Sequence, residues 1–539
     1  MKRPLFDNIL IAFQNTLLAI FGAILLLRAY GSLDWRIEHD TPLLHYSALL
    51  MNKYGLIPYR DIFETSLPGT FAFHYLIGRL FGYGDTPFRY VDLMLLCGLL
   101  FATYKFMSRF SRLVAMWSAV LFGLLYLSSG NIMSLQRDYI GIIPIAFSLL
   151  CIPATMDTPV RLTRFALVGL LFGMSVLVKP HLVISLPIIF GTLLAFRWHS
   201  QQRRYFDFIK CGVITSLSFL IPICMTLIWL AANSALLQFV EMLFNYLPLY
   251  NALTGNFVSI HGWTRILYLI DNTATFGGMG ALLLCSLFAY YFASIHRVDK
   301  VTTISLMCLC LCTIAYAIYP TLAGKFWQYH YMPLIYFGSV SAGLCLLTAP
   351  KYVNSHFTHK AQKILPLLIL VITMAITLKL HLSKYAELLT SPNTYPSQKT
   401  QVLQKIPASN IERADEMAAW LKIKLRPNDT VQPLFGTGIS IHAMLMADAK
   451  LATQFMYGHP FSHHVSSPYI QELRRSFMNQ LRESSPRFIT TGKSWAYGAD
   501  TTPEFPELRQ FINDYYKISH EGSGDVIYER KRANIESGN

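Results

Sequence analysis

Long apolar runs separated by short polar stretches repeat through the first 380 residues of the chain. A helix that crosses a bilayer needs about 20 mostly apolar residues, and several of these runs are shorter, so some spans are expected to be tilted. Eleven runs are read as spans, at 9–27, 90–107, 113–129, 139–154, 165–178, 181–197, 211–231, 275–294, 301–319, 331–348 and 363–380. The pattern predicts a polytopic α-helical membrane protein.

Residues 29–89 separate the first two spans and hold two short amphipathic segments. Thr41–Tyr54 places leucines at helical spacing, and Pro68–Phe81 begins with a proline that favours a helix start. Neither segment is long enough to cross the membrane. We therefore expect two interfacial helices in this loop, framing its unusually dense carboxylates.

Residues 381–539 are polar and follow a different pattern. Helices are predicted at 411–425, 468–483 and 506–516, and strands near 430–435, 451–457 and 487–490, followed by a hairpin of 516–519 and 525–529. Alternating helices and short strands predict a small α/β domain. The chain thus divides into a membrane domain, 1–380, and a second domain, 381–539.

Composition supports the membrane assignment. Of 539 residues, 53% are hydrophobic and 14% are charged, against about 25% charged in a soluble domain. The net charge of +15 comes from basic residues scattered at the ends of apolar runs, without a basic face of interleaved aromatics. This excludes nucleic acid as a predicted partner and favours membrane lipids. All nine cysteines lie in apolar runs, so no disulfide framework or zinc spacing is indicated.

Basic residues set the predicted orientation. Loops that carry lysine and arginine alternate with loops that carry carboxylates, and the basic loops belong on the cytoplasmic side. The N-terminus is then inside, retained as a first helix because no small-residue cleavage site follows residues 9–27. Residues 29–89 and the domain 381–539 are predicted to lie outside.

Candidate reactive residues collect in the external loops. Sugar transfer from a lipid-phosphate donor needs a base for the acceptor hydroxyl, a cation for the departing phosphate and a groove for the lipid. The side chains that could supply this chemistry are Asp40, Arg60, Glu64, Arg137, Asp138, Lys179, Lys325 and His330.

Five motifs follow one another along the chain: HDTP (39–42), GLIPYRDIFETSLPG (55–69), QRDY (136–139), GLLFGMSVLVKP (169–180) and QYHYMP (328–333). They resemble motifs of the lipid-dependent GT-C glycosyltransferases, with the bacterial aminoarabinose transferases and protein O-mannosyltransferases as the nearest groups. Their order and sidedness carry the resemblance, which covers about residues 1–350.

The resemblance implies an inverting enzyme that moves a hexosyl or pentosyl group from a polyprenyl-phosphate sugar to an envelope glycolipid, polysaccharide or protein. It implies the bacterial inner membrane, with a periplasmic second domain. The implied roles are catalysis for Asp40 and Asp138, donor-phosphate binding for Arg60, Arg137, Lys179, Lys325 and His330, and an acceptor or secondary acid for Glu64. Thr41 stands where the family has a second acid, so the sequence does not decide whether Mg²⁺ or Mn²⁺ takes part.

Alternatives remain both for the roles of single residues and for the function of the whole protein. Asp40 could be a solvated loop acid, Arg60 and Arg137 could pair with neighbouring acids, and Lys179 could reach lipid phosphates. Other functions are an oligosaccharide ligase with a polyprenyl-diphosphate donor, a flippase for lipid-linked sugars, or a structural envelope protein. A transporter usually shows charges at mid-membrane and two related halves, neither of which is apparent.

Overall fold

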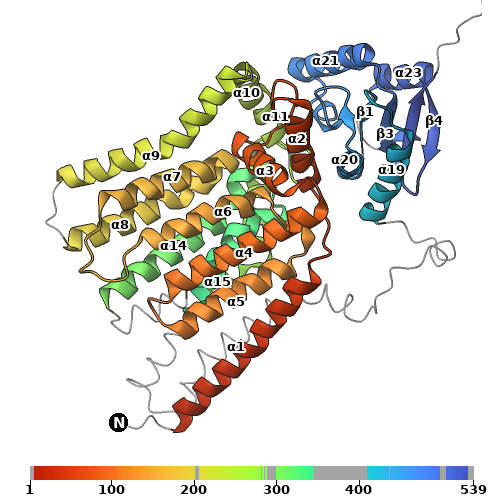
Figure 1. Cartoon of the computed structure of the whole chain (residues 1–539). Helices are drawn as coiled ribbons and strands as arrows, with labels where there is room; N and C mark the ends of the chain where they lie inside the picture. The colour runs from red at the N-terminus through yellow and green to blue at the C-terminus, as the bar shows by residue number, and fades with distance from the viewer. Residues whose placement is uncertain are drawn as a thin grey trace, which may run out of the picture.

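The computed structural model describes residues 5–200, 205–280, 282–284, 286–287, 299–344, 409–435, 437–497 and 505–531. The predicted span 363–380 lies outside these residues, as does part of the span 275–294. Figure 1 shows the membrane helices side by side, with the C-terminal domain beyond the end of the bundle where α2 (Thr41–Tyr54), α3 (Pro68–Phe81) and α11 (Leu247–Asn251) lie.

The apolar runs form helices close to the predicted bounds. These are α1 (Leu5–Gly31), α4 (Asp85–Met107), α5 (Arg112–Ser128), α6 (Arg137–Ser148), α7 (Leu162–Val178), η3 with α8 (Pro180–Ser185, Leu186–Ser200), α9 (Tyr205–Ala232), α14 (Lys300–Ala323) and α15 (Met332–Gly343). Among the described residues, five helices are long and apolar enough to cross a membrane, and two shorter ones are apolar. This supports a multi-pass protein, while the count of eleven spans stays a prediction.

Residues 29–89, the first external loop of the predicted topology, hold two short helices as predicted, at α2 (Thr41–Tyr54) and α3 (Pro68–Phe81). Gly55 ends α2 in the left-handed conformation, with φ of 66°, which glycine adopts without steric cost. Most of α2 is buried, because it lies between α3 and a helix of the C-terminal domain. It is therefore a contact element between the two domains.

A second segment that the predicted topology places outside follows α9. It consists of α10 (Leu236–Glu241), the π-helical turn η4 (Met242–Tyr246), α11 (Leu247–Asn251) and α12 (Gly262–Ala274). Phe239 and Met242 pack with Tyr59 and Phe71 of the first external loop. The two external segments therefore meet over the end of the bundle.

The C-terminal domain contains a five-stranded mixed sheet in the order β2-β1-β3-β5-β4. Strand β1 (Thr430–Pro433) pairs in parallel with β2 (Lys450–Leu451) and β3 (Phe488–Gly492), while β5 (Asp525–Arg530) pairs antiparallel with β3 and β4 (Tyr516–Glu521). Its helices are α19 (Asn410–Lys424), α20 (Thr437–Met446), α21 (Pro468–Ser484), α22 (Lys493–Ala496) and α23 (Pro506–Tyr515).

Two details of this domain differ from the prediction. The strand expected at 451–457 has only the two residues of β2, and α20 was not predicted. After β2 the chain leaves the sheet and runs along the first external loop, where Phe63 N donates to Gln454 O at 2.8 Å. This departure carries residues 454–459 to the membrane domain.

Further contacts dock the C-terminal domain. The Tyr46 hydroxyl of α2 donates to Ala449 O at 2.8 Å, and the Tyr54 hydroxyl donates to Asp448 O at 2.9 Å. Arg36 forms ion pairs with Asp85 and, at 2.9 Å, with Asp415 of α19. The domain is thus held along α2 and the segment before it.

Helices α7 and α9 approach each other closely. A Cβ placed on Gly169 would lie 2.2 Å from Thr215 O, and one on Gly173 would lie 2.3 Å from Phe219 O. Small residues four apart let helix backbones approach in a membrane. This contact fixes α9 beside the site described next.

Candidate functional site

Asp40 precedes α2 as its N-cap residue, yet its carboxylate makes no bond to that helix. It accepts instead from the Tyr329 hydroxyl at 3.0 Å and from Arg137 Nη2 at 3.3 Å, and it lies 3.1 Å from His39 Nδ1. Burial alone would raise the pKa of Asp40, but His39, Arg137 and Tyr329 outweigh it and lower the pKa to about 2. Asp40 is therefore a fixed carboxylate at neutral pH.

Arg137 begins α6 and links the loops around Asp40. Its Nη1 donates to Ser66 Oγ at 3.2 Å, while its Nε is buried without a hydrogen-bond partner among the described residues. A buried donor that lacks a partner is costly, so an acceptor from a ligand would stabilise this position. Arg137 is the first candidate for an anion contact.

Lys179 follows the last residue of α7 and pairs with Asp138. Lys179 Nζ lies 2.9 and 2.7 Å from the two Asp138 oxygens, and the Tyr319 hydroxyl also donates to Asp138. Burial lowers the pKa of Lys179 to about 8, although Asp138 opposes the change. Lys179 therefore keeps its charge at pH 7 but lies close to losing it.

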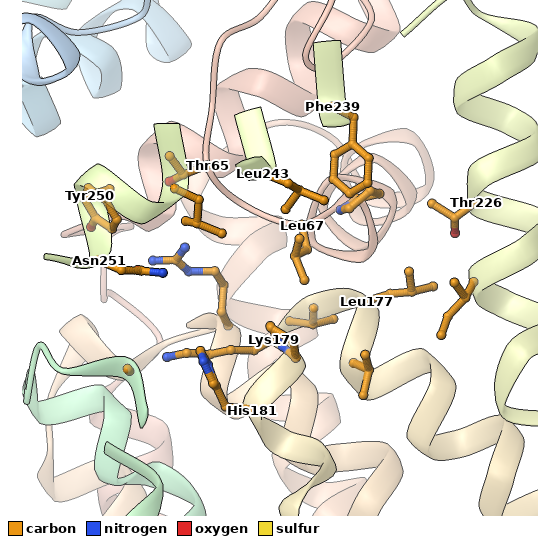
Figure 2. A pocket seen from close by; sticks show the side chains of 18 of the residues that line it. Thr65, Leu67, Leu177, Lys179, His181, Thr226, Phe239, Leu243, Tyr250 and Asn251 are labelled. Carbon is orange, nitrogen blue, oxygen red and sulfur yellow. The ribbon is translucent and has the colours of Figure 1, made fainter. Parts of the chain in front are cut away.

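A cavity of about 340 Å³, here called cavity A, opens between α7, α9 and the segment α10–α11. Figure 2 shows Lys179 and His181 toward one side of it and Phe239 and Leu177 toward the other. His330 lines the same side, and both His181 Nδ1 and His330 Nδ1 are buried without partners among the described residues. Cavity A thus joins a basic end to an apolar groove.

A second cavity of about 360 Å³, here called cavity B, lies between the first external loop and the C-terminal domain. The membrane side supplies Asp40 and Glu64, and the C-terminal side supplies Tyr457 and His459. Four residues line both cavities: Thr65, Arg137, Tyr250 and Trp327. Asp40 and Lys179 therefore face two spaces that adjoin at Arg137.

Glu64 is buried in the wall of cavity B, with 2% of its surface exposed. Its Oε1 accepts from the backbone N–H of Thr65 at 2.9 Å and from the Ser66 N–H at 3.2 Å, and its Oε2 accepts from the Tyr457 hydroxyl at 2.8 Å. These bonds fix the turn that leads into α3. Glu64 is therefore held as a structural acceptor beside the cavity.

The other predicted site residues divide into two groups. Lys179, Arg137, Lys325 and His330 all line cavity A. Arg60 lies outside both cavities, where it pairs with Asp61 at 2.7 Å and donates to Asn233 O. Arg60 therefore matches the alternative to phosphate binding, which was an ion pair with a neighbouring acid.

Two predicted residues take different positions from those expected. Lys325 Nζ donates to the carbonyl oxygens of Tyr250 at 2.8 Å and Leu253 at 3.0 Å, which fastens α11 above cavity A. Asp138 is fully buried behind Lys179 and is not a lining residue of either cavity. Asp138 contacts the site through Lys179, whereas Lys325 lines cavity A with its ammonium group bonded to these carbonyls.

Sequence reasoning missed several residues of the site. His39 and Tyr329 contact Asp40, His181 lines cavity A, and Tyr457 and His459 come from the C-terminal domain. His39 also has a positive φ of 61°, uncommon for a residue with a side chain. His39 stands next to Asp40 in the sequence, which was the one local signal, whereas no spacing connects Tyr329 with Asp40 or Tyr457 with Glu64.

The described residues do not provide a metal site. They include no group of three or more histidine, cysteine or carboxylate side chains placed to hold an ion. His459 and His463 approach each other, with ring centroids 5.0 Å apart, but His459 lies edge-on to the Tyr250 ring and His463 lies tilted against the Tyr246 ring. Asp40 and Asp138 are each occupied by a basic side chain, so the donor set does not fit Mg²⁺ or Mn²⁺.

Comparison with known proteins gives a result only at the level of structure. No family model matches the chain, and no curated protein matches its sequence. Crystal structures of ArnT from Cupriavidus metallidurans, apo and bound to undecaprenyl phosphate, match with TM-scores of 0.53 and 0.52 and 13% identity. They cover 95% and 96% of this chain and 98% of ArnT.

A second match is the archaeal oligosaccharyltransferase AglB from Archaeoglobus fulgidus, in complex with an inhibitory peptide and a dolichol-phosphate. It has a TM-score of 0.48 and 10% identity, over 98% of this chain and 75% of AglB. ArnT and AglB are GT-C fold glycosyltransferases. The chain has the GT-C fold, which confirms the prediction from the order of its motifs.

Proposed function

We propose that this GT-C protein is an inverting glycosyltransferase that moves a sugar from a polyprenyl-phosphate donor to an acceptor hydroxyl outside the membrane. The observation that carries the proposal is the meeting of cavities A and B at Arg137, with Lys179 on one side and Asp40 on the other. The acceptor belongs to an envelope glycolipid, polysaccharide or protein.

Cavity A suits the lipid-phosphate donor. Arg137 and Lys179 can contact a phosphate group, while Leu177, Leu227 and Phe239 offer an apolar wall for the lipid chain. The fold match to ArnT bound to undecaprenyl phosphate supports the same ligand class. We place the donor phosphate at the basic end, with the sugar directed toward Arg137.

Cavity B suits the acceptor. As its hydroxyl oxygen attacks the anomeric carbon, the bond from that carbon to the phosphate oxygen breaks, and the hydroxyl proton passes to Asp40. The leaving phosphate takes the bonding electron pair, and Lys179 and Arg137 stabilise its charge. Attack from the side opposite the phosphate inverts the anomeric configuration.

Arg137 contacts Asp40 and lines cavity A, so binding of the donor phosphate at Arg137 can change the basicity of Asp40. Without a ligand, Arg137 and His39 hold the pKa of Asp40 at about 2, which makes it a weak proton acceptor. A phosphate in cavity A would compete for the guanidinium and raise the basicity of Asp40. Binding of the donor and activation of the acceptor are then coupled through one side chain.

The remaining carboxylates act through neighbours in this proposal. Asp138 holds Lys179 at cavity A, and Glu64 holds the turn that carries Ser66. The proposal keeps the predicted orientation, with the N-terminus in the cytoplasm of a bacterium and both cavities at the outer face of its inner membrane. No step is assigned to a metal.

The first test replaces the base. Asp40→Asn keeps the shape of the side chain but removes most of its basicity, so transfer should fall by at least about 100-fold. Envelope glycans and glycoproteins of cells lacking the chromosomal copy are compared by mass spectrometry after complementation with wild type or variant. The product that the wild type restores should stay absent with Asp40→Asn.

Asp34→Asn is the matched control, because Asp34 is an exposed acid of the same loop. It should restore the product as the wild type does, at equal protein amount. Full product from Asp40→Asn at that amount, or no glycan difference between the deletion strain and its parent, would overturn the proposal.

A further inference from the structure

A chain of hydrogen bonds runs from the C-terminal domain to the proposed base. The Tyr457 hydroxyl donates to Glu64 Oε2 at 2.8 Å, and Ser66 Oγ donates to Glu64 Oε1 at 3.2 Å. Arg137 Nη1 donates to the same Ser66 Oγ at 3.2 Å, and Arg137 Nη2 donates to Asp40 Oδ2 at 3.3 Å. One continuous path thus connects a residue after β2 with the carboxylate at α2.

The start of this path is firmly placed. Next to Tyr457, Phe63 N donates to Gln454 O at 2.8 Å, and the rings of Phe63 and Phe455 lie 5.3 Å apart. Gly458 N donates to Leu434 O at 2.9 Å, which joins this segment to the end of β1. The sheet of the C-terminal domain therefore determines where the Tyr457 hydroxyl lies.

The middle of the path has little freedom. Glu64 is buried, and its Oε1 is engaged by Thr65 and Ser66, so Oε2 depends on Tyr457 as its donor. A buried carboxylate oxygen that loses its donor reorganises toward water or another donor. Such a movement would displace the Ser66 hydroxyl, which Arg137 contacts.

We propose that Tyr457 is a positioning residue through which the C-terminal domain, acting on Glu64, Ser66 and Arg137, sets the place of Asp40. The inference rests on the proposed function, since it assigns Asp40 as the base. It makes the C-terminal domain part of the reaction machinery without giving it a group that touches the reacting atoms. It also explains why this domain approaches the membrane loop at Glu64.

The simplest competing explanation is that Tyr457 only helps to dock the domain. Tyr54 provides the matched comparison, because its hydroxyl also bonds across the interface, to Asp448 O at 2.9 Å, and it lines neither cavity. Tyr457→Phe and Tyr54→Phe each remove one hydroxyl and one interdomain bond. Only the first removal interrupts the path to Asp40.

The test uses the full-length chain and two measurements. Product formation in complemented deletion cells is quantified by mass spectrometry at matched protein amounts, and binding of undecaprenyl phosphate is measured on the purified variants in detergent. Tyr457→Phe should lower product formation about tenfold while changing lipid affinity less than about twofold, since geometry rather than donor binding is altered. Tyr54→Phe should leave both near wild type.

A double-variant comparison decides whether the effect travels through Glu64. Tyr457→Phe added to Glu64→Gln should cause no further loss, because the path is already broken there. Tyr54→Phe added to Glu64→Gln should leave product formation at the level of Glu64→Gln alone.

Equal losses for Tyr457→Phe and Tyr54→Phe, a parallel fall in lipid binding, or additive losses with Glu64→Gln would overturn the inference. Failure of this inference can be distinguished from failure of the proposed function. If the proposed function fails, the wild type yields no product, or Asp40→Asn remains active. If Asp40→Asn is inactive while Tyr457→Phe behaves as wild type, only the positioning role of Tyr457 is overturned.

Discussion

Two lysines that line cavity A show how the same residue type takes different roles. Lys179 faces a carboxylate and keeps its ammonium group at the cavity wall. Lys325 Nζ donates hydrogen bonds to backbone carbonyls at the end of α11, and burial lowers the pKa of Lys325 to about 7. We therefore assign phosphate contact to Lys179, and support of the cavity roof to Lys325.

Lys179 gives donor binding a specific pH dependence. Since its pKa is lowered to about 8, it is protonated below that pH and loses its charge as the pH rises through it. Affinity for undecaprenyl phosphate should fall between pH 7 and pH 9 in the wild type. Lys179→Arg should retain its affinity at pH 9, because arginine stays charged there.

Lys450→Arg serves as the control for this measurement, because Lys450 is exposed and lines neither cavity A nor cavity B. It should show the alkaline loss of the wild type. Coincident pH curves for the wild type and Lys179→Arg would remove Lys179 from the phosphate site.

The candidate reactive residues of each loop could be predicted from the sequence. The side-chain contacts between distant loops could not. The motifs singled out Arg137, Lys179 and His330, and all three line cavity A, while their predicted roles at a phosphate stay a proposal. Tyr329 lies 289 positions from Asp40, and Tyr457 lies 393 positions from Glu64. Contacts at such separation depend on how whole elements pack, which periodicity does not encode.

At the scale of elements, local signals explain which predictions held. Pro68 starts α3 and Gly55 ends α2, so their bounds follow from backbone chemistry. The predicted strand at 451–457 instead leaves the sheet after Leu451, because residues 454 and 455 pair with Phe63. There the tertiary contact overrides the local preference for a strand.

The contact between α7 and α9 yields a prediction about cavity A. Gly173→Val would place side-chain atoms against Phe219 O and Pro222, which must move. Because Thr226 and Leu227 of α9 line cavity A, the shift should widen the cavity and weaken undecaprenyl phosphate binding. Overpacking of this kind costs about 1–3 kcal/mol of stability.

Gly212→Ala is the control on α9, since a Cβ there meets no atom within 4 Å. It should leave both lipid binding and thermal stability in detergent near wild type. Equal lipid affinity for Gly173→Val and wild type would show that this helix pair does not shape the cavity.

At the scale of the whole molecule, Arg36 ties the two domains together. It pairs with Asp85 at the start of α4 and with Asp415 of α19, and His442 of α20 lies 3.1 Å from the same Asp85. Arg36→Ala removes the cation between two carboxylates, so docking should weaken by about 1–2 kcal/mol. Limited proteolysis should then release the C-terminal domain faster.

Arg475→Ala is the comparison, because that arginine makes an exposed pair with Glu472 within α21. Its proteolysis rate should match the wild type. A wild-type rate for Arg36→Ala would mean that the contacts along α2 hold the domain without the ion pairs.

The unequal origin of the two cavities has a consequence for how such proteins diversify. Among the described residues, those that line cavity A all lie between Thr65 and His330. Cavity B is also lined by four residues of the C-terminal domain: Gly438, Ile441, Tyr457 and His459. Under the proposed roles, substitutions at Gly438, Ile441 or His459 change the acceptor side while the lipid carrier stays the same, whereas Tyr457 is needed to hold Glu64. Natural variants that share a carrier but decorate different surfaces should therefore differ at those three positions and keep Tyr457.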